Sequence, residues 1–414
     1  MTGIEIASTL PTAEPSAWTL QGPPADYTVG HVRAVLPDRV LDDARIVVRD
    51  GRIVEVGPSV PGVRHDVDGG GLLCLPGLVD VHSDGLEKER MPRPGVELPW
   101  PFSLMSFEGK VRAAGVTTVF HGASFSDRST AASGRSVHVA QQMCESVEQW
   151  GERDTEAPLV DHRVLHRLDV RSSAGFVALR AEFERLVETG AVTAATPAVI
   201  SHEDHTPGIG QYADRAYYEK YIVGMRGISV AEARKVVDEL ASEREANAAI
   251  RDETMGWLAE QSRTGLVRIF GHDPESAVEI ADLAARGGNV AEFPTTVEAA
   301  REARVRGMSV VMGGPNVLRG RSHSGNVSAG ELADLGLVTA LASDYLPSSL
   351  MGAAFALADR GLTLPQAVSL VTSGPATAVG LADRGALCVG QRADLVLVAV
   401  ERSHPVTRAV LRAM

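Results

Sequence analysis

The chain has 414 residues, of which 44% are hydrophobic and 41 are glycine, and this length suffices for one large core plus a smaller domain. Its formal net charge of -13 argues against a nucleic-acid partner, because such binding depends mostly on cationic groups that neutralise phosphates. No stretch approaches the roughly 20 uninterrupted apolar residues that a membrane-spanning helix needs, so we expect no membrane partner either.

The first residues lack the basic start and apolar centre of a signal peptide, and we interpret residues 1–26 as a loosely ordered extension. The three cysteines, Cys74, Cys144 and Cys388, are odd in number and far apart in the sequence. This usage predicts a cytoplasmic protein without a disulfide framework, in which each cysteine is a small buried apolar residue.

Short β segments stand at both ends of the remaining chain. Alternating β-branched runs flank Asp50-Gly51, which is a strong hairpin signal, and the C-terminal "GALCVGQRADLVLVAV" again predicts strand, turn and strand. We therefore expect residues 27–75 and 382–414 to form one small β-sandwich domain together.

The centre, residues 76–381, alternates strand-like runs with helical stretches, which is the pattern of parallel βαβ units. The predicted strands are "LPGLVDVH", "GVTTVFHG", "HRVLHRLD", "TPAVISHEDH", "LVRIFGHD", "GGNVAEFP", "GMSVVMGGP" and "LVTALASD". The sequence thus predicts an α/β protein whose catalytic domain is a (β/α)₈ TIM-like barrel. Residues 206–265 are too long for one connection, and we expect a helical insertion of two or three helices there.

Potential metal ligands follow several of these strands, and in a barrel the carboxyl ends of the strands surround one site. The candidates are His82, Asp84, Asp169, His205, His272 and Asp344. Histidine nitrogens and carboxylates suit Zn or Mn, and a carboxylate in the middle of a barrel can bridge two divalent ions. In His82-x-Asp84 the alternation of a strand sends both side chains to one face.

Each histidine taken singly is more often a structural residue than a ligand, and the joint arrangement at successive strand ends favours the metal site. His202 competes with His205 for one position, and we prefer His205 because it stands where the strand ends. His121 and His166 lie inside apolar runs, which predicts core or supporting roles for them.

Four motifs resemble a known family: "HSDGLEKERMPRPGV", "DHTPGIGQYAD", "AEFPTTVEAAREARVRGMSVVMGGPNVLRGRSHSGNVSAGELADLGL" and "ASDYLPSSL". With "LPGLVDVHSD" and the closing "GQRADLVLV", the chain resembles the amidohydrolase superfamily and, within it, the α-D-ribose 1-methylphosphonate 5-triphosphate diphosphatase family of the carbon-phosphorus lyase pathway. The resemblance implies a dinuclear metal centre held by the six candidates and hydrolysis of a ribose 5-triphosphate to the 5-phosphate and pyrophosphate. Asp344 would hold metal and take the proton of the attacking hydroxide.

Cationic and hydroxyl residues flank these ligands. The predicted substrate-binding residues are Lys88, Arg93, Arg319, Arg321, Ser322, His323 and Ser324. Guanidinium groups grip phosphate oxygens bidentately, so this set would make a local exception in an acidic protein. The alternative is that exposed arginines merely solvate a loop.

The sequence departs from the family pattern at Gly85, where asparagine is usual, and at Asp169, where glutamate is typical. The alternative function is an amidohydrolase or deaminase that acts on a C-N bond of a cyclic amide or amino-heterocycle. A third hypothesis is a binding protein that has lost turnover, against which the complete ligand set argues. A homo-oligomer is compatible with the sequence.

Overall fold

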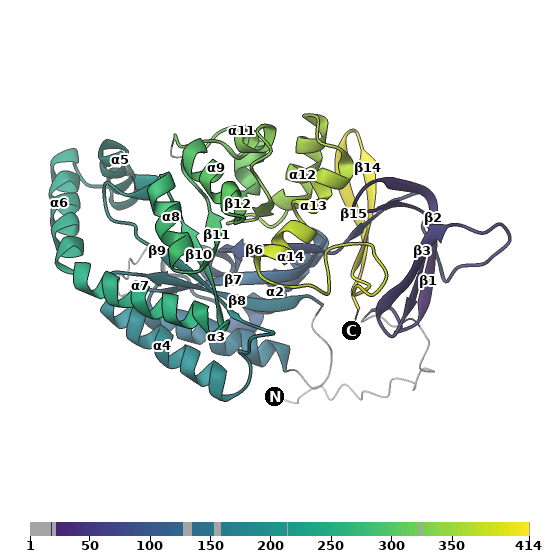
Figure 1. Cartoon of the computed structure of the whole chain (residues 1–414), viewed down its shortest axis with the longest axis horizontal. Coiled ribbons are helices and arrows are strands. Elements are labelled where there is room, and N and C mark those ends of the chain that lie inside the picture. Colours follow the sequence, from purple (N-terminus) through teal and green to yellow (C-terminus); the bar gives the residue numbers. More distant parts are fainter. Residues whose placement is uncertain are drawn as a thin grey trace, which may run out of the picture.

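The computed structural model describes residues 18, 22–126, 135–152, 159–212, 214–322 and 325–413. These residues form a barrel of parallel strands surrounded by helices and, beside it, a separate sheet built from both ends of the chain (Figure 1). The predicted fold class is confirmed. In the part of the chain that the structure describes, no helix has the length and apolar character that crossing a membrane requires. The predicted extension, residues 1–26, falls mostly outside the described residues.

Eight strands make the barrel and follow one another in chain order around it. They are β6 (Leu78–Ser83), β7 (Val116–Phe125), β8 (Asp161–Asp169), β9 (Ala198–Glu203), β10 (Val267–His272), β11 (Gly288–Glu292), β12 (Ser309–Gly313) and β13 (Ala340–Ala342). Every strand predicted from the sequence is present, because each is an apolar or β-branched run bounded by glycine, proline or charged residues.

Side chains of the barrel strands alternate between the interior and the helix layer. Phe270 and Val290 belong to the apolar cluster that fills the interior, and two positions further on the next inward residues are His272 and Glu292. Apolar packing therefore gives way to polar side chains at the carboxyl ends of the strands. That end is where enzymes with this fold place their active sites.

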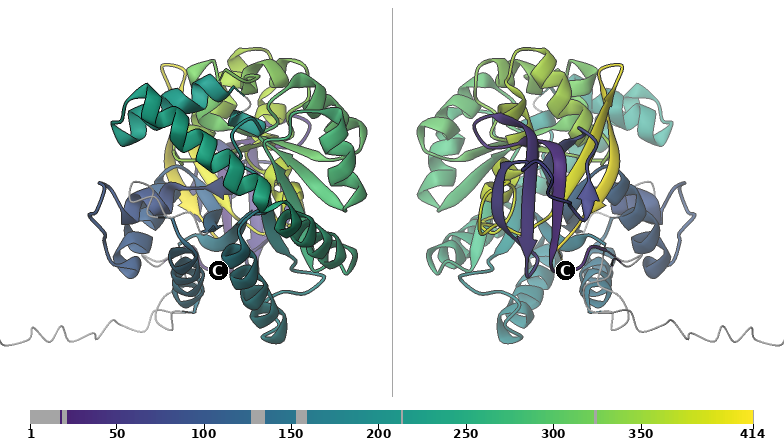
Figure 2. Two further views of the ribbon diagram at one scale, coloured as in Figure 1. Left: turned by 90° about the vertical axis from the view of Figure 1, so that its left-hand side faces the viewer. Right: turned by 90° about the vertical axis from the view of Figure 1, so that its right-hand side faces the viewer.

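Helices cover the outside of the barrel (Figures 1 and 2). They are α1 (Gly85–Arg90), α2 (Trp100–Ala113), α3 (Val137–Gly151), α4 (Ser173–Glu188), α5 (Arg215–Arg226), α6 (Val230–Ala246), α7 (Ala248–Arg263), α8 (Ala277–Ala285), α9 (Val297–Val305), α10 (Gly314–Arg319), α11 (Ala329–Asp334), α12 (Ser349–Asp359), α13 (Leu364–Ser369) and α14 (Ser373–Ala378), with a 3₁₀ turn at Gly210–Tyr212.

The second sheet has the order β15-β14-β5-β1-β2-β3, and β4 pairs with β1. Its strands are β1 (Tyr27–Val35), β2 (Val40–Arg49), β3 (Arg52–Pro58), β4 (Val67–Asp68), β5 (Leu73–Pro76), β14 (Leu395–Glu401) and β15 (His404–Leu411). The β2–β3 hairpin turns at Asp50 and Gly51, whose φ angles of 50° and 67° fit the predicted two-residue turn. Strand β14 pairs with β5, so the two chain ends lie side by side (Figure 2).

Helices α5, α6 and α7 occupy the segment between β9 and β10. The first two pack on each other through a small cluster that includes Tyr218, Ile222 and Val237, and they stand out from the barrel in Figure 1. Arg244, near the end of α6, is buried and donates to Thr206 at 2.7 Å. The insertion is thereby tied to the strand ends that carry the site.

Candidate metal centre and active site

The polar side chains at the carboxyl ends of the strands form one continuous cluster. It contains His82 of β6 with Asp84 just after it, Glu203 of β9 with His205 just after it, His272 of β10 with Asp273 just after it, Glu292 of β11, and Asp344 after β13. In this cluster, nitrogen and oxygen atoms from distant parts of the chain lie within about 4 Å of one another. Such a set of donors suits divalent zinc or manganese.

Glu292 orients two of the histidines. Its Oε1 accepts from Nδ1 of His82 at 2.8 Å, and its Oε2 accepts from Nδ1 of His272 at 2.7 Å. Ser201 donates its hydroxyl to the same Oε2 at 2.6 Å. With Nδ1–H donated to a carboxylate, each histidine presents Nε2 as its ligand atom, which is the usual support of a metal-binding histidine.

His82, Asp84 and Asp344 make the first group of potential ligands. Nε2 of His82 lies 3.6 Å from Oδ1 of Asp84. The pairing of β6 with β7 shifts register between Asp80 and Ser83, and Asp84 stands just beyond the strand, so strict alternation does not set this geometry. Asp344 has a φ of 56°, a region that aspartate tolerates better than most residues.

His205, His272 and Asp273 make the second group. Oδ2 of Asp273 lies 3.7 Å from Nε2 of His205 and 3.5 Å from Nε2 of His272. This oxygen is buried and has no hydrogen-bond donor among the described residues. A buried carboxylate oxygen without a donor is costly, and a cation would satisfy it. The residues of both groups therefore fit a divalent metal.

Two arginines lie beside the first group. Nη1 of Arg167 donates to both oxygens of Asp84 at 2.6 and 2.7 Å, and its Nε donates to Glu203. Arg135 donates to Asp84 at 2.6 Å and to Glu87 at 2.9 Å. Glu203 also lies 3.7 Å from Nδ1 of His205, so its carboxylate stands between the arginine and the second group.

The charges of this cluster shift the pKa of its members. Burial lowers the pKa of His82, but Glu292 and Asp84 outweigh it and raise that pKa to about 10. Burial likewise opposes protonation of His272, and Asp273 and Glu203 nevertheless raise its pKa to about 9. The acidic groups therefore favour positive charge here, which a divalent cation would also supply.

Asp344 differs from Asp84, whose pKa the neighbouring arginines hold well below its usual value despite burial. Burial and the neighbouring charge of Asp84 raise the pKa of Asp344 above its usual value. A carboxylate with a raised pKa is a better proton acceptor near neutral pH. Burial also opposes ionisation of Glu292, but the two histidines hold its pKa well below the usual range, as its supporting position requires.

Five of the six predicted ligands are therefore brought together, and the sixth is placed differently. Oδ2 of Asp169 accepts from Arg244 at 2.7 Å and from Ser126 at 3.2 Å, and Oδ1 accepts from the backbone of Arg171. Asp169 belongs to none of the ligand groups formed by the described residues. Its ligand role stays a prediction, and Glu203, opposite it across the β8–β9 ladder, lies nearer the histidines.

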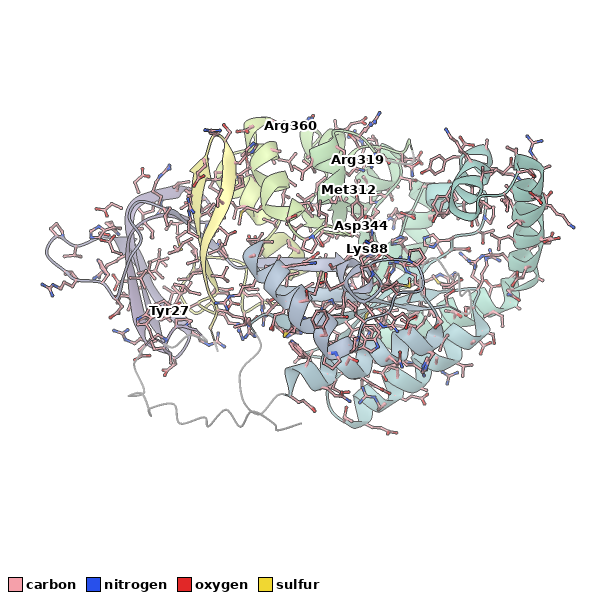
Figure 3. All side chains as sticks on the ribbon, turned by 180° about the vertical axis from the view of Figure 1, so that it is seen from behind. Tyr27, Lys88, Met312, Arg319, Asp344 and Arg360 are labelled. Atoms are coloured by element: carbon pink, nitrogen blue, oxygen red, sulfur yellow. The ribbon has the colours of Figure 1, made fainter. Side chains whose placement is uncertain are left out.

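Of the predicted phosphate-binding residues, Lys88 lies beside the first group of ligands. Lys88 places its ammonium 4.5 Å from the ring centre of Tyr345, the residue after Asp344. Lys88 and Asp344 are labelled close together in Figure 3. Arg93, Arg319 and Arg321 are exposed, and Ser322 is partly buried. His323 and Ser324 lie outside the described residues.

A cavity of about 620 Å³ lies beside the second group of ligands. His272 and Asp273 line it, together with Arg171 and Arg251 and several acidic residues. His202, the competitor of His205, also lines this cavity and does not join the ligand groups of the described residues. His205, in contrast, belongs to the second group of potential ligands, and its metal role stays a prediction.

The model of the "Amidohydrolase family" matches residues 109–410. The chain belongs to the amidohydrolase family. It is 36% identical to α-D-ribose 1-methylphosphonate 5-triphosphate diphosphatase of Escherichia coli over 91% of this chain and 96% of the relative. It is also 28% identical to imidazolonepropionase of Deinococcus deserti over 86% of this chain and 85% of the relative. Membership of this family makes the chain a metal-dependent hydrolase.

Solved structures of other amidohydrolases share the fold. The 5-methylcytosine deaminase of Klebsiella pneumoniae has a TM-score of 0.60 at 15% identity and covers 93% of this chain and 96% of its own. The N-acetyl-D-glucosamine-6-phosphate deacetylase of Mycobacterium smegmatis has a TM-score of 0.59 at 16% identity and covers 94% and 98%. At these identities the amidohydrolase structures support the barrel alone.

Five residues of the site were not predicted from the sequence, namely Glu203, Asp273, Glu292, Arg135 and Arg167. Glu292 stands near the end of a predicted strand, Asp273 directly follows a predicted ligand, and Glu203 stands two residues before His205, so a strand-end signal was present for these three. Arg167 lies two residues before Asp169 on β8, and its side chain points into the barrel. For Arg135 we find no local signal, because its partners are set by tertiary contacts alone.

Proposed function

We propose that the enzyme hydrolyses α-D-ribose 1-methylphosphonate 5-triphosphate to the 5-phosphate and pyrophosphate. The observation that carries this proposal is the 36% identity to the diphosphatase over nearly the whole of both chains. The geometry supports it, since two groups of metal ligands meet at the carboxyl ends of the strands beside the buried Arg167 and the partly buried Arg135.

In this proposal two divalent ions, zinc or manganese, are held by His82, Asp84 and Asp344 and by His205, His272 and Asp273. Bound there, such ions polarise a phosphoryl oxygen and lower the pKa of water. Asp169, if it is a ligand as predicted, would have to leave Arg244 first. Glu203 reaches the second group without such a change, and we place it beside these ions in preference to Asp169.

Asp344 is the proposed general base. Water attacks the α phosphorus, the bond to the bridging α–β oxygen breaks, and pyrophosphate leaves, while the carboxylate of Asp344 accepts the proton of the attacking water. The raised pKa and burial of Asp344 suit this role.

Cationic side chains would hold the phosphate chain. Lys88 projects at the mouth beside Tyr345, and Arg93, Arg319 and Arg321 are exposed. Ser322, His323 and Ser324 complete the proposed substrate-binding set. We place the enzyme in the cytoplasm, consistent with its three free cysteines.

Phosphorus NMR of the metal-loaded protein with the ribose 5-triphosphate tests the proposal. Pyrophosphate and the 5-phosphate are the expected products. Orthophosphate would move the cleaved bond to the β–γ position, and absence of any phosphate product would refute the proposed substrate.

The relatives that act on imidazolonepropionate favour a second candidate, hydrolysis of a C-N bond in a cyclic amide or amino-heterocycle. The arginines Arg135 and Arg167 beside Asp84 argue against it, because a neutral heterocycle does not require them. Turnover of a cyclic amide without turnover of the triphosphate would establish this candidate instead.

A further inference from the structure

A second cluster of metal-binding side chains lies in the helix layer. Cys144 of α3, His166 of β8 and Glu182 of α4 each place one ligand atom within 4.8 Å of the other two. Arg167 faces the barrel interior, where it contacts Asp84, so the preceding His166 faces outward by the alternation of the strand. The strand itself therefore separates this cluster from the catalytic centre.

The histidine of this cluster is held in the orientation that metal binding requires. Nδ1 of His166 lies 3.3 Å from the carbonyl oxygen of Val199 on the neighbouring strand and donates its proton there. This backbone contact leaves Nε2 with a lone pair, as in many metal sites. His166 is 5% exposed and Cys144 is 4% exposed, so the donors are shielded from bulk water.

The carboxylate of Glu182 is held by an arginine that has a second partner. Arg185 donates to both oxygens of Glu182 at 3.0 Å, and it also donates to Glu148 of α3 at 3.2 Å. If Glu182 turned one oxygen toward a cation, Arg185 would still be paired with the carboxylate of Glu148. The arginine would therefore not be left without a carboxylate.

We propose that Cys144, His166 and Glu182 bind a thiophilic divalent cation, such as zinc or cadmium, at a site distinct from the catalytic centre. One thiolate, one imidazole and one carboxylate with a water molecule make a four-coordinate set that zinc accepts. On binding, the S–H bond of Cys144 breaks, a metal–sulfur bond forms, and the proton goes to solvent. Two negative ligands then balance the charge of the cation.

Known bond lengths test whether the cluster could close. Metal–sulfur and metal–nitrogen bonds of about 2.3 and 2.1 Å place tetrahedral ligand atoms roughly 3.5 Å apart. The three atoms already lie within 4.8 Å, so rotations of side chains about single bonds would bring them together. The bound ion would then link α3, β8 and α4.

Cobalt substitution of the full-length enzyme tests the site. The proposed catalytic ligands are nitrogen and oxygen atoms, so a thiolate-to-cobalt charge-transfer band in the near ultraviolet reports on cysteine coordination alone. We expect this band in the wild type, together with one equivalent of cobalt beyond the catalytic ions. Cys144→Ser should lose both the band and that equivalent and keep its hydrolytic rate.

Cys74→Ser is the matched control, because Cys74 is also buried but lies in the second sheet, and it should keep the band. His166→Gln provides a variant that retains the thiol, and it should lose the extra equivalent as well. A wild type without the band, or a band that survives Cys144→Ser, would overturn the proposal. If Cys144→Ser fails to fold, an unchanged cobalt content in His166→Gln would overturn it.

Discussion

Replacing Glu292 with glutamine tests whether this residue orients the two histidines of the proposed metal centre. The carboxylate accepts from His82 at 2.8 Å and from His272 at 2.7 Å. Glutamine has one acceptor oxygen, and its amide nitrogen is a donor that would face the N–H of the other histidine. One of the two histidines must therefore change its tautomer or its orientation.

The expected magnitude follows from the role of such supporting groups. Loss of a hydrogen-bonding partner behind a metal ligand typically lowers metal affinity by about 10- to 100-fold. At about 1.4 kcal/mol for each tenfold step, Glu292→Gln should weaken binding by roughly 1.4 to 2.8 kcal/mol. Competition with a chromophoric chelator measures this affinity directly.

Ser201→Ala is the control for Glu292→Gln, because it removes the 2.6 Å donation to Glu292 and leaves both histidine contacts in place. We expect less than a tenfold loss of affinity for this control. An unchanged affinity in Glu292→Gln would refute the supporting role. Complete loss of one metal equivalent would also refute it, since it would make Glu292 a ligand.

Three further outcomes are expected. Asp344→Asn, which keeps a residue type tolerated at a φ of 56°, should lower turnover by about 10²- to 10⁴-fold with an unchanged circular dichroism spectrum, and an active variant would remove Asp344 from the base role. Burial and the neighbouring His162 hold the pKa of His121 well below 6.5, so the unfolded chain binds more protons below pH 6.5. The free energy of unfolding should therefore fall with decreasing pH below 6.5 by up to about 1.4 kcal/mol per unit from this group, and urea denaturation of His121→Gln should give a shallower slope; equal slopes would contradict it. A Cβ at Gly85 would lie 2.5 Å from the buried ring of Phe107, so Gly85→Ala should cost about 1 to 3 kcal/mol in thermal unfolding and Phe107→Leu should recover part of it; a neutral Gly85→Ala would show that the ring moves freely.

The barrel could be predicted from the sequence because its signals are local. Each strand is a short apolar run with clear boundaries, and the order of strands follows the order of the chain, as successive βαβ units require. The hairpin at Asp50 and Gly51 was predictable for the same reason, since both residues adopt the positive φ that such a turn needs.

The site could be predicted only in part because some of its members depend on distant partners. His82, His205 and His272 stand at or just after strand ends, and it is their joint arrangement there that predicts a metal site. The hydrogen-bond partners of Asp169 could not be predicted from the sequence, since Arg244 comes from the end of an inserted helix. The requirement for glycine at position 85 could not be predicted from the local sequence either, because it comes from the ring of Phe107 on the next helix, which leaves no room for a side chain.

The β-bridge between Ser83 and Asp344 has a consequence for local opening of the barrel. Asp344 donates its backbone N–H to His82 at 2.9 Å, and Asp84 donates its own to Asp344 at 2.5 Å, so the closure of the cylinder runs through the residues of the first ligand group. A cation held by these side chains would span the same joint that the backbone bonds close. Metal removal should then speed amide hydrogen exchange at Asp84 and Asp344 more than in the interior ladder between β8 and β9. Metal binding would therefore be required both for catalysis and for stable closure of the barrel.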